Sequence, residues 1–283
     1  FDGMSCGQIA LDKLGVKVNK YYASEIDKYA IQVTQNNYPN TKHIGSVLDV
    51  KGGNLPKIDL LYGGSPCQSF SSAGNGKGFD GKSGLFWEFV RVLKETNPKY
   101  FLLENVIMKK EWENIITDAL GVSPVEINSN LVSAQDRRRL YWTNIPNLSK
   151  PKDKNIFIKD IKEDKPNRKV KSTLVKYFDS VFFEKYNSKG GTIKVFDGCK
   201  QGYFNSSFSQ NRIFSSEGKC PTLTTGCDIN IYEFGGKLTP IECERLQTVP
   251  DNYTKCVSDT QRARMLGNGW PVDVIAHILQ NIK

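Results

Sequence analysis

The chain has 283 residues, of which 39% are hydrophobic and 11% aromatic, so it can bury a substantial core without disulfides or metals. No uninterrupted apolar run approaches the roughly 20 residues of a membrane span, and we identify no signal peptide, so we expect neither a membrane protein nor a secreted one. Because the first residue is Phe1 and not a methionine, we expect a short leading segment, with a strand directly before Phe1.

The net charge of +9 is concentrated in one part of the chain. The stretch from Asn144 to Lys219 has 16 Lys or Arg against 8 Asp or Glu and so carries +8. Such clustering is the electrostatic footprint of nucleic-acid binding, although a solvated lysine-rich surface would give the same count. Among the seven cysteines no pair has the spacing of a zinc site, so we expect reduced thiols and no metal.

The first half of the chain, from Phe1 to about Trp142, alternates apolar runs with helical patterns, which predicts a parallel sheet with crossover helices. Strands are expected at Asn19–Ala23, Ile44–Leu48, Ile58–Tyr62, Tyr100–Leu103, Val125–Ile127 and Leu140–Trp142. The apolar face of one connecting helix is expected to consist of Leu85, Phe86, Phe89, Val90 and Leu93.

Acidic or reactive residues stand where four of these strands end. Glu25 follows the first strand, Asp49 closes the second, Cys67 follows the third, and Glu104 ends the fourth. Ligands of open α/β sheets bind outside the carboxyl ends of the strands. We therefore expect these four residues to face one shared crevice.

The second half is less regular. Pro146 and Pro151 predict a linker out of the first domain, and the residues from about Lys150 to Lys219 show no strong periodicity. A helix is expected to begin at Thr239-Pro240-Ile241-Glu242, a capping box with proline at the first helical position. A last helix is expected to pack against the core through an apolar stripe formed by Val274, Ile275, Ile278, Leu279 and Ile282.

The run Gly63-Gly64-Ser65-Pro66-Cys67-Gln68 predicts a thiol presented after a buried strand, because the glycines allow a sharp turn and the proline stiffens the residue before the cysteine. The alternative is a cysteine that serves as a small core residue. The next residues, Ser69 to Gly84, contain five glycines and four serines. This composition predicts a lid that closes over a substrate.

A carboxylate that ends a buried strand, as Glu104 does, needs a partner or a task. In an extended chain Arg137 and Arg139 point to one face and Arg138 to the other, so two guanidinium groups could pair with Glu104. Taken alone, Glu104 could equally be a helix cap or a member of an ordinary ion pair, and the arginines a solvated basic turn.

Six motifs, in this order, resemble those of the cytosine-5 DNA methyltransferase family, most closely its compact phage and bacterial members and the vertebrate de novo catalytic domains. They are Phe1 to Gly7, Pro66-Cys67-Gln68, Glu104-Asn105-Val106, Gln135 to Arg139, Asn211-Arg212 with Pro221 to Thr224, and Gly267-Asn268-Gly269. The chain departs from the family where Ser5 and Cys6 replace glycines and where Gly269 and Trp270 follow the last asparagine.

The resemblance implies an α/β fold, with a Rossmann-like S-adenosylmethionine-dependent methyltransferase sheet and a second, smaller target-recognition domain for DNA. It places the catalytic and cofactor-binding domain at residues 1–143, with 220–283 returning to it, and the recognition domain at 144–219. The implied function is site-specific transfer of a methyl group from S-adenosylmethionine to C5 of cytosine in duplex DNA, with base flipping. The alternatives are a transfer-RNA cytosine-5 methyltransferase and an inactive DNA-binding paralogue.

The resemblance also implies residue roles. The catalytic residues would be Cys67 as nucleophile, Glu104 on N3 and the amine of the base, Arg139 on O2, and Arg137 in support. The residues implied to hold the cofactor, released as S-adenosylhomocysteine, are Phe1, Gly3, Met4, Glu25, Ile26, Asp49, Val50, Pro66, Leu85 and Asn268. We expect a cytoplasmic monomer in a prokaryotic or phage-infected cell, with double-stranded DNA as partner, no membrane contact and a place in restriction-modification.

Overall fold

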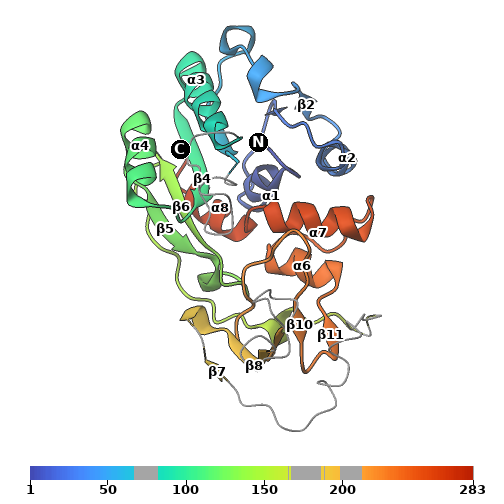
Figure 1. Cartoon of the computed structure of the whole chain (residues 1–283). Coiled ribbons are helices and arrows are strands. Elements are labelled where there is room, and N and C mark those ends of the chain that lie inside the picture. The colour runs from blue at the N-terminus through green and yellow to red at the C-terminus, as the bar shows by residue number, and fades with distance from the viewer. Residues whose placement is uncertain (67–81, 165, 167–185, 188, 198–211, 283) are drawn as a thin grey trace. The chain divides into compact units, whose positions relative to one another are not determined.

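The structure, a computed structural model, describes residues 1–66, 82–164, 166, 186–187, 189–197 and 212–282 (Figure 1). These residues form two compact units, which are described separately. Unit 1 consists of Phe1–Asn128, Arg138–Lys150 and Ile275–Lys283, and unit 2 of Ser129–Arg137 and Pro151–Val274. Among the described residues, no helix has the length and apolar character required to cross a membrane.

The main sheet of unit 1 has four strands in the order β3, β4, β6, β5. They span Leu60–Gly64 (β3), Tyr100–Val106 (β4), Val125–Asn128 (β5) and Arg138–Thr143 (β6). β3 and β4 are parallel, whereas β6 is antiparallel to both β4 and β5. This sheet is therefore mixed, and within it the predicted parallel pairing is found between β3 and β4. The reason is that no crossover helix follows β5: the chain turns back within nine residues, Ser129–Arg137, and runs down the same sheet as β6.

A second, two-stranded parallel sheet joins β1, Tyr22–Ala23, to β2, Lys42–His43. The strand expected at Ile44–Leu48 is absent there, because Ser46 caps a short 3-10 turn, Val47–Asp49, by accepting a hydrogen bond from the Leu48 N–H. A cavity of about 520 Å³ lies between the two sheets of unit 1, lined by residues of both and by Phe89 of helix α3.

Helices α1 (Cys6–Lys13), α2 (Lys28–Asn37), α3 (Phe86–Thr96) and α4 (Lys110–Leu120) complete unit 1. The apolar face predicted for α3 is confirmed, since Phe86, Phe89 and Val90 are buried and Leu93 is partly buried against them. They share one core cluster with Ile116 of α4, Phe101 and Leu103 of β4, and Leu140 and Trp142 of β6. The pleat therefore turns Phe101 and Leu103 toward α3 and α4, and it turns Leu102 and Glu104 to the opposite face.

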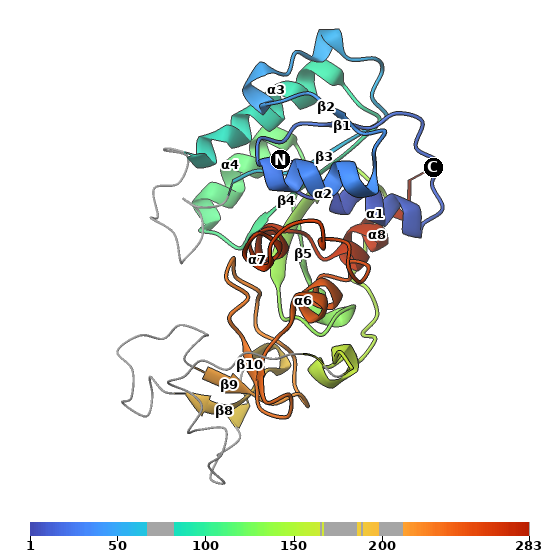
Figure 2. The same ribbon diagram turned by 90° about the vertical axis from the view of Figure 1, so that its right-hand side faces the viewer.

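The described part of unit 2 contains a five-stranded sheet together with helices α6 and α7 (Figure 2). Its strands are β7 (Tyr186–Asn187), β8 (Ile193–Asp197), β9 (Arg212–Phe214), β10 (Asn230–Ile231) and β11 (Gly236–Lys237), in the order β11, β10, β9, β8, β7. Helix α6, Pro240–Leu246, begins with the predicted capping box: the Glu242 N–H donates to Thr239 Oγ1 at 3.2 Å, and the Thr239 N–H donates to Glu242 Oε2 at 3.0 Å. Helix α7 spans Asp259–Asn268.

The last helix, α8 (Val272–Leu279), crosses the boundary between the units. Of its predicted stripe, Val274, Ile275, Ile278 and Leu279 are buried, whereas Ile282 lies beyond the end of the helix and is partly exposed. Residues 220–274 belong to unit 2, together with the residues that precede them. In the last part of the chain, Ile275–Lys283 belongs to unit 1. This grouping differs from the division into 1–143 with 220–283 and 144–219. That division concerns function and stays a prediction.

Candidate active site

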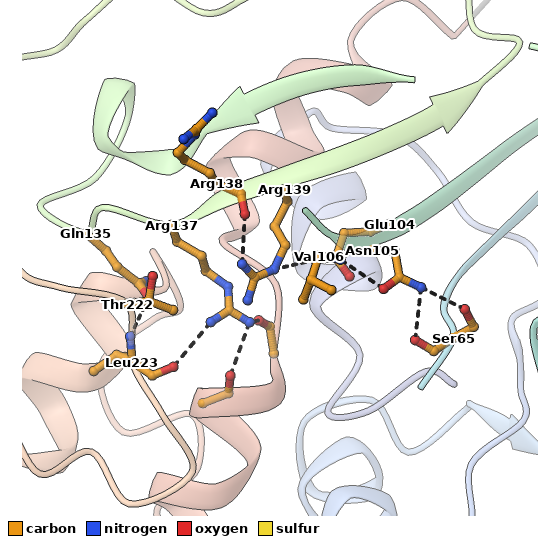
Figure 3. Close-up of polar contacts among 12 residues, drawn as sticks. Ser65, Glu104, Asn105, Val106, Gln135, Arg137, Arg138, Arg139, Thr222 and Leu223 are labelled. Carbon is orange, nitrogen blue, oxygen red and sulfur yellow. Dashed lines mark hydrogen bonds and ion pairs between the residues drawn. The ribbon is translucent and has the colours of Figure 1, made fainter. Parts of the chain in front are cut away.

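The carboxylate expected at the end of β4 has a guanidinium partner. Arg139 Nε lies 3.0 Å from Glu104 Oε1, and the two side chains are 14% and 10% exposed (Figure 3). Arg139 Nη1 also donates to the carbonyl oxygen of Arg138 at 2.8 Å, which fixes the plane of the guanidinium group. A charged hydrogen bond to a carboxylate in such a sheltered place is short and orients both groups.

The end of β3 is held beside Glu104. Gly64 is the register partner of Glu104, and one residue later the Asn105 amide donates to Ser65 Oγ at 3.0 Å. Asn105 Oδ1 in turn accepts from the Val106 N–H at 2.9 Å. Asn105 therefore fixes the backbone two residues before Cys67, and Cys67 itself lies outside the described residues, as does most of the lid expected at 69–84.

Arg137 belongs to unit 2 and makes contacts of another kind. Its Nη1 donates to the carbonyl oxygen of Leu223 at 3.3 Å, and its Nη2 donates to those of Gly267 and Gly269, both at 3.1 Å (Figure 3). Arg137 precedes β6, which begins at Arg138, so the alternation expected of an extended strand does not extend to it. The pairing with Glu104 predicted for two arginines is observed for Arg139, while Arg138 turns away, as expected, and pairs with Glu126 at 2.7 Å.

Gln135 is fully buried in unit 2 and joins three segments. Its Oε1 accepts from the Leu223 N–H at 2.9 Å, and its Nε2 donates to Gln247 Oε1 at 3.0 Å. Gly267 packs so closely on the Thr224 carbonyl that an added Cβ would lie 2.4 Å from it, which explains a glycine at this position. These contacts tie the motif at Gln135–Arg137 to those at 221–224 and 267–269.

Glu25, placed after β1 as predicted, holds the first loop of the chain. Its carboxylate accepts from the Gly3 N–H at 2.9 Å and from the N–H groups of Ile26 and Asp27, both at 2.8 Å. Burial opposes ionisation, whereas these backbone N–H donors favour it, and the pKa of Glu25 lies below its ordinary value. Glu25 is therefore a charged, fixed acceptor beside the glycine loop.

Asp49 ends the 3-10 turn after β2 and is exposed. Its turn is fixed by a residue that sequence reasoning missed. Arg91 of α3 donates from Nη2 to the Val47 carbonyl at 3.0 Å and from Nη1 to the Val50 carbonyl at 2.7 Å. The flanking Glu88 and Glu95 pair with the same guanidinium group. From sequence, acids at these helical spacings only suggest surface ion pairs.

The surroundings of Glu25 and Asp49 fit a nucleoside. β1 and β2 are parallel neighbours, and Ser24 Oγ donates to the Gly45 carbonyl at 3.0 Å, so the loops that follow them lie side by side. Each acid has an unusually exposed apolar neighbour: Ile26 is 78% exposed and Leu48 62%. Exposed apolar side chains beside fixed acids offer a surface for an aromatic base and acceptors for hydroxyl or amino groups.

The other predicted cofactor residues lie as follows. In unit 1, Met4 and Val50 are buried, whereas Phe1, Gly3, Pro66 and Leu85 are partly exposed. Asn268 is exposed at the end of α7 in unit 2. These positions do not test the predicted roles.

A mixed α/β sheet with a glycine loop and acids at its strand ends places the protein in the class of α/β folds whose ligands bind outside the carboxyl ends of the strands. Comparison of the sequence with known proteins identifies the family. The family model for C-5 cytosine-specific DNA methylase matches residues 1–283. The chain is 31% identical to Type II methyltransferase M1.ScrFI of Lactococcus lactis subsp. cremoris, a match that covers 94% of this chain and 72% of that one. It is 28% identical to Type II methyltransferase M.HhaI of Haemophilus parahaemolyticus, over 100% and 92%.

Solved structures show the same fold. The methyltransferase EhMeth of Entamoeba histolytica matches with a TM-score of 0.72 at 15% identity and covers 100% of this chain and 97% of its own. The Dnmt2 methyltransferase of S. pombe matches with a TM-score of 0.65 at 18% identity, over 99% and 95%. The chain therefore belongs to the C-5 cytosine-specific DNA methylase family. Membership makes it a DNA cytosine-5 methyltransferase, an enzyme class that uses S-adenosylmethionine.

Proposed function

We propose that the protein methylates C5 of cytosine at a specific site in duplex DNA, with Cys67 as the covalent nucleophile. The observation that carries this proposal is the Glu104–Arg139 pair, which stands at the sheet edge where β3 leads into Pro66 and Cys67. A carboxylate and a guanidinium group held 3.0 Å apart present acceptor and donor atoms together. Such a pair is suited to the N3, amine and O2 edge of cytosine.

The chemistry explains the need for these residue types. Cytosine C5 is too weak a nucleophile to take a methyl group directly. The Cys67 thiolate adds to C6, the C5–C6 double bond opens toward C5, and Glu104 stabilises the proton acquired at N3. Bound S-adenosylmethionine supplies an electrophilic sulfonium methyl group, which C5 takes. Loss of the C5 proton to a base then re-forms the double bond and expels the Cys67 thiolate, and N3 releases the proton that it acquired, so neutral 5-methylcytosine and the free enzyme result.

Arg139 has two tasks in this scheme. It keeps the Glu104 carboxylate oriented, and its remaining donors are suited to O2 of the base. Arg137 supports the site at one remove, since its donors are engaged by the carbonyls of the 223 and 267–269 segments. The target base must leave the duplex to reach these groups, at a cost of a few kcal/mol for unstacking. The predicted lid at 69–84 would close over it.

The cofactor is proposed to bind at the strand ends of unit 1. Glu25 would accept from the ribose hydroxyls and Asp49 from the adenine amine, while Phe1, Ile26, Val50 and Leu85 would pack on the base. Gly3, Met4 and Pro66 would line the methionine part, and Asn268 would close the site. The exposed apolar side chain of Ile26 lies next to Glu25, whose lowered pKa keeps its carboxylate ionised, and this supports the assignment.

DNA recognition is proposed for residues 144–219, where the positive charge is concentrated. The two relatives named above are called Type II methyltransferases, which supports a place in restriction-modification. A cytoplasmic, monomeric protein remains our proposal.

Transfer of a labelled methyl group to duplex DNA, compared with transfer RNA, tests the function. Incorporation into cytosine of DNA supports it. Incorporation into transfer RNA alone would establish the RNA alternative, and cofactor binding without any transfer would establish the inactive paralogue.

A further inference from the structure

Ser5 has a backbone conformation that glycine normally occupies. Its φ is 61° and its ψ 41°, in the left-handed region, directly before helix α1. A Cβ is unfavourable there unless the surroundings compensate for it. The compensation is visible: the buried Ser5 hydroxyl donates to the carboxylate of Asp2 and lies 3.1 Å from Thr34 Oγ1 of α2. The hydroxyl thus fixes a turn that a glycine would leave free.

Asp2 is the centre of a longer chain of hydrogen bonds. Its other carboxylate oxygen accepts from the hydroxyl of Tyr21, which precedes β1, and Tyr21 accepts from the hydroxyl of Tyr62 in β3 at 2.8 Å. Loss of hydration raises the pKa values of both tyrosines well above their ordinary value, so both stay protonated and able to donate. Gly7 of α1 packs directly on the Tyr62 ring, where an added Cβ would lie 2.2 Å away.

These contacts tie the loop Phe1–Ser5 to α2, to the segment before β1 and to β3. The same loop presents the Gly3 N–H to Glu25, the carboxylate proposed to hold the cofactor ribose. β3 is the strand that leads to Pro66 and Cys67. The network therefore contacts both the proposed cofactor loop and the strand that precedes the nucleophile. Its members are not among the residues proposed to contact the cofactor.

We propose that Asp2, Ser5, Tyr21 and Tyr62 are positioning residues that hold the loop Phe1–Ser5 in its cofactor-binding conformation before the cofactor arrives. This inference rests on the proposed cofactor site. It predicts that weakening the network lowers affinity for the cofactor without slowing methyl transfer, because an unordered loop must be ordered on binding.

The test is calorimetric titration of the full chain with S-adenosylhomocysteine. Tyr21→Phe removes the donor to Asp2 and the acceptor for Tyr62, and should raise Kd about tenfold. Tyr62→Phe removes only the outer hydroxyl and should raise Kd about two- to threefold. Ser5→Ala keeps the Cβ but loses the hydroxyl and should raise Kd about tenfold. Ser5→Gly loses both and leaves the turn free, so it should raise Kd at least as much as Ser5→Ala.

Tyr38→Phe is the matched control. The hydroxyl of Tyr38, directly after α2, also donates to an aspartate, Asp12 of α1, at 2.7 Å, but in an exposed hydrogen bond that includes no residue of the loop Phe1–Ser5. The substitution Tyr38→Phe should leave the Kd for S-adenosylhomocysteine unchanged. In steady state, Tyr21→Phe should raise KM for S-adenosylmethionine while kcat and KM for DNA change less than about twofold. In the absence of ligand, hydrogen exchange at the amides of Gly3 to Cys6 should be faster in Tyr21→Phe than in wild type.

Unchanged Kd in folded Tyr21→Phe and Ser5→Ala would overturn the proposal, as would an equal rise in Tyr38→Phe. If either variant fails to fold, the Tyr62→Phe titration decides in its place. Wild-type protein that binds S-adenosylhomocysteine but methylates no DNA would refute the proposed function and leave this inference standing. Wild-type protein that does not bind it would refute both.

Discussion

Arg139 reaches Glu104 diagonally across two antiparallel strands. In the register of β4 and β6, Arg139 stands opposite Val106 and Tyr141 opposite Glu104, so the pair spans one diagonal step on a shared face. Diagonal neighbours lie about 7–8 Å apart at their backbones, a gap that only a long side chain closes. The 3.0 Å contact between Arg139 Nε and Glu104 Oε1 therefore depends on the length and fork of arginine.

Substitutions in this pair should affect catalysis more than stability. Glu104→Gln should lower single-turnover methyl transfer about 10²- to 10⁴-fold, because the neutral amide lacks the negative charge that stabilises a proton at N3. Arg139→Ala should lower the rate as well and destabilise the fold by about 1–3 kcal/mol, since it leaves a sheltered carboxylate without its ion pair. Single-turnover kinetics and urea unfolding measure the two effects. Arg138→Ala, which breaks only the exposed pair with Glu126, is the control and should be near neutral in both.

Cys67→Ser should abolish methyl transfer and leave cofactor affinity nearly intact, because it replaces only the soft nucleophile. A duplex with 5-fluorocytosine at the target should trap wild-type protein covalently, since fluorine cannot leave as the C5 proton does. Peptide mapping of the adduct identifies the attached residue. Substantial turnover by the serine variant, or an adduct on another cysteine, would contradict the assigned nucleophile.

Much of this site could be predicted from strand ends alone. Glu25 and Glu104 stand where the apolar runs place them, because a buried strand and the carboxylate after it are local features of the sequence. Arg137 could not be placed in this way: whether it belongs to β6 depends on where pairing with β4 and β5 begins. Arg91 donates to the backbone carbonyls of Val47 and Val50, and Asn105 donates to the hydroxyl and carbonyl oxygens of Ser65. These partners are far away in the chain, and no local pattern reveals them.

Cofactor affinity should depend on both strand-end acids and on the support of one of them. Glu25→Ala and Asp49→Ala should each weaken S-adenosylmethionine binding by roughly 1–3 kcal/mol, with little change in DNA affinity without cofactor. Arg91→Ala should weaken it by a smaller amount, because it frees the turn Val47–Val50 without removing Asp49. Calorimetry checks all three. Unaltered cofactor affinity in both acid variants would refute the placement of the site.

Two carboxyl groups, that of Asp2 in the loop Phe1–Ser5 and that of Glu25, which accepts a hydrogen bond from this loop, should give opposite dependences of stability on pH. The pKa of Glu25 is lowered, so its ionised form favours the folded state. Its contribution is present above the ordinary value of 4.5 and is lost as pH falls through the folded pKa. The pKa of Asp2 is raised, chiefly by loss of hydration. Its contribution is present below the ordinary value of 3.8 and is lost as pH rises through the folded pKa.

Urea unfolding between about pH 3.5 and 7 measures this contrast. The free energy of unfolding of wild type minus that of Glu25→Gln should grow as pH rises, and the difference from Asp2→Asn should shrink. Slopes of the same sign would show that one of the two environments is misassigned.

The charge of residues 144–219 is not uniformly available for DNA. Several of its cations are engaged within unit 2: Lys159 pairs with Glu217 at 2.7 Å, and Lys194 and Arg212 share Asp197. The Lys219 ammonium is buried and donates to the carbonyls of Asn130 and Ile156, both at 2.6 Å. Lys169 and Lys171 lie outside the described residues, in the stretches that hold seven of the 16 cations and only two of the eight acids.

Neutralising Lys169 and Lys171 together should therefore weaken binding to all duplexes and reduce the salt dependence of affinity, without moving the methylated site, because phosphate contacts carry no sequence information. Lys159→Gln is the matched control: its charge is already paired with Glu217, so its loss should change the salt slope less. Exchanging residues 144–219 for the corresponding segment of a relative should instead move methylation to the donor's site, since base-edge contacts each discriminate by about 1–3 kcal/mol. Bisulfite sequencing of DNA treated with the chimera reads this out. If the target site is unchanged while Cys67 remains the nucleophile, recognition lies outside 144–219, with 69–84 as the next segment to exchange, and the basic stretch serves only to hold the phosphate backbone.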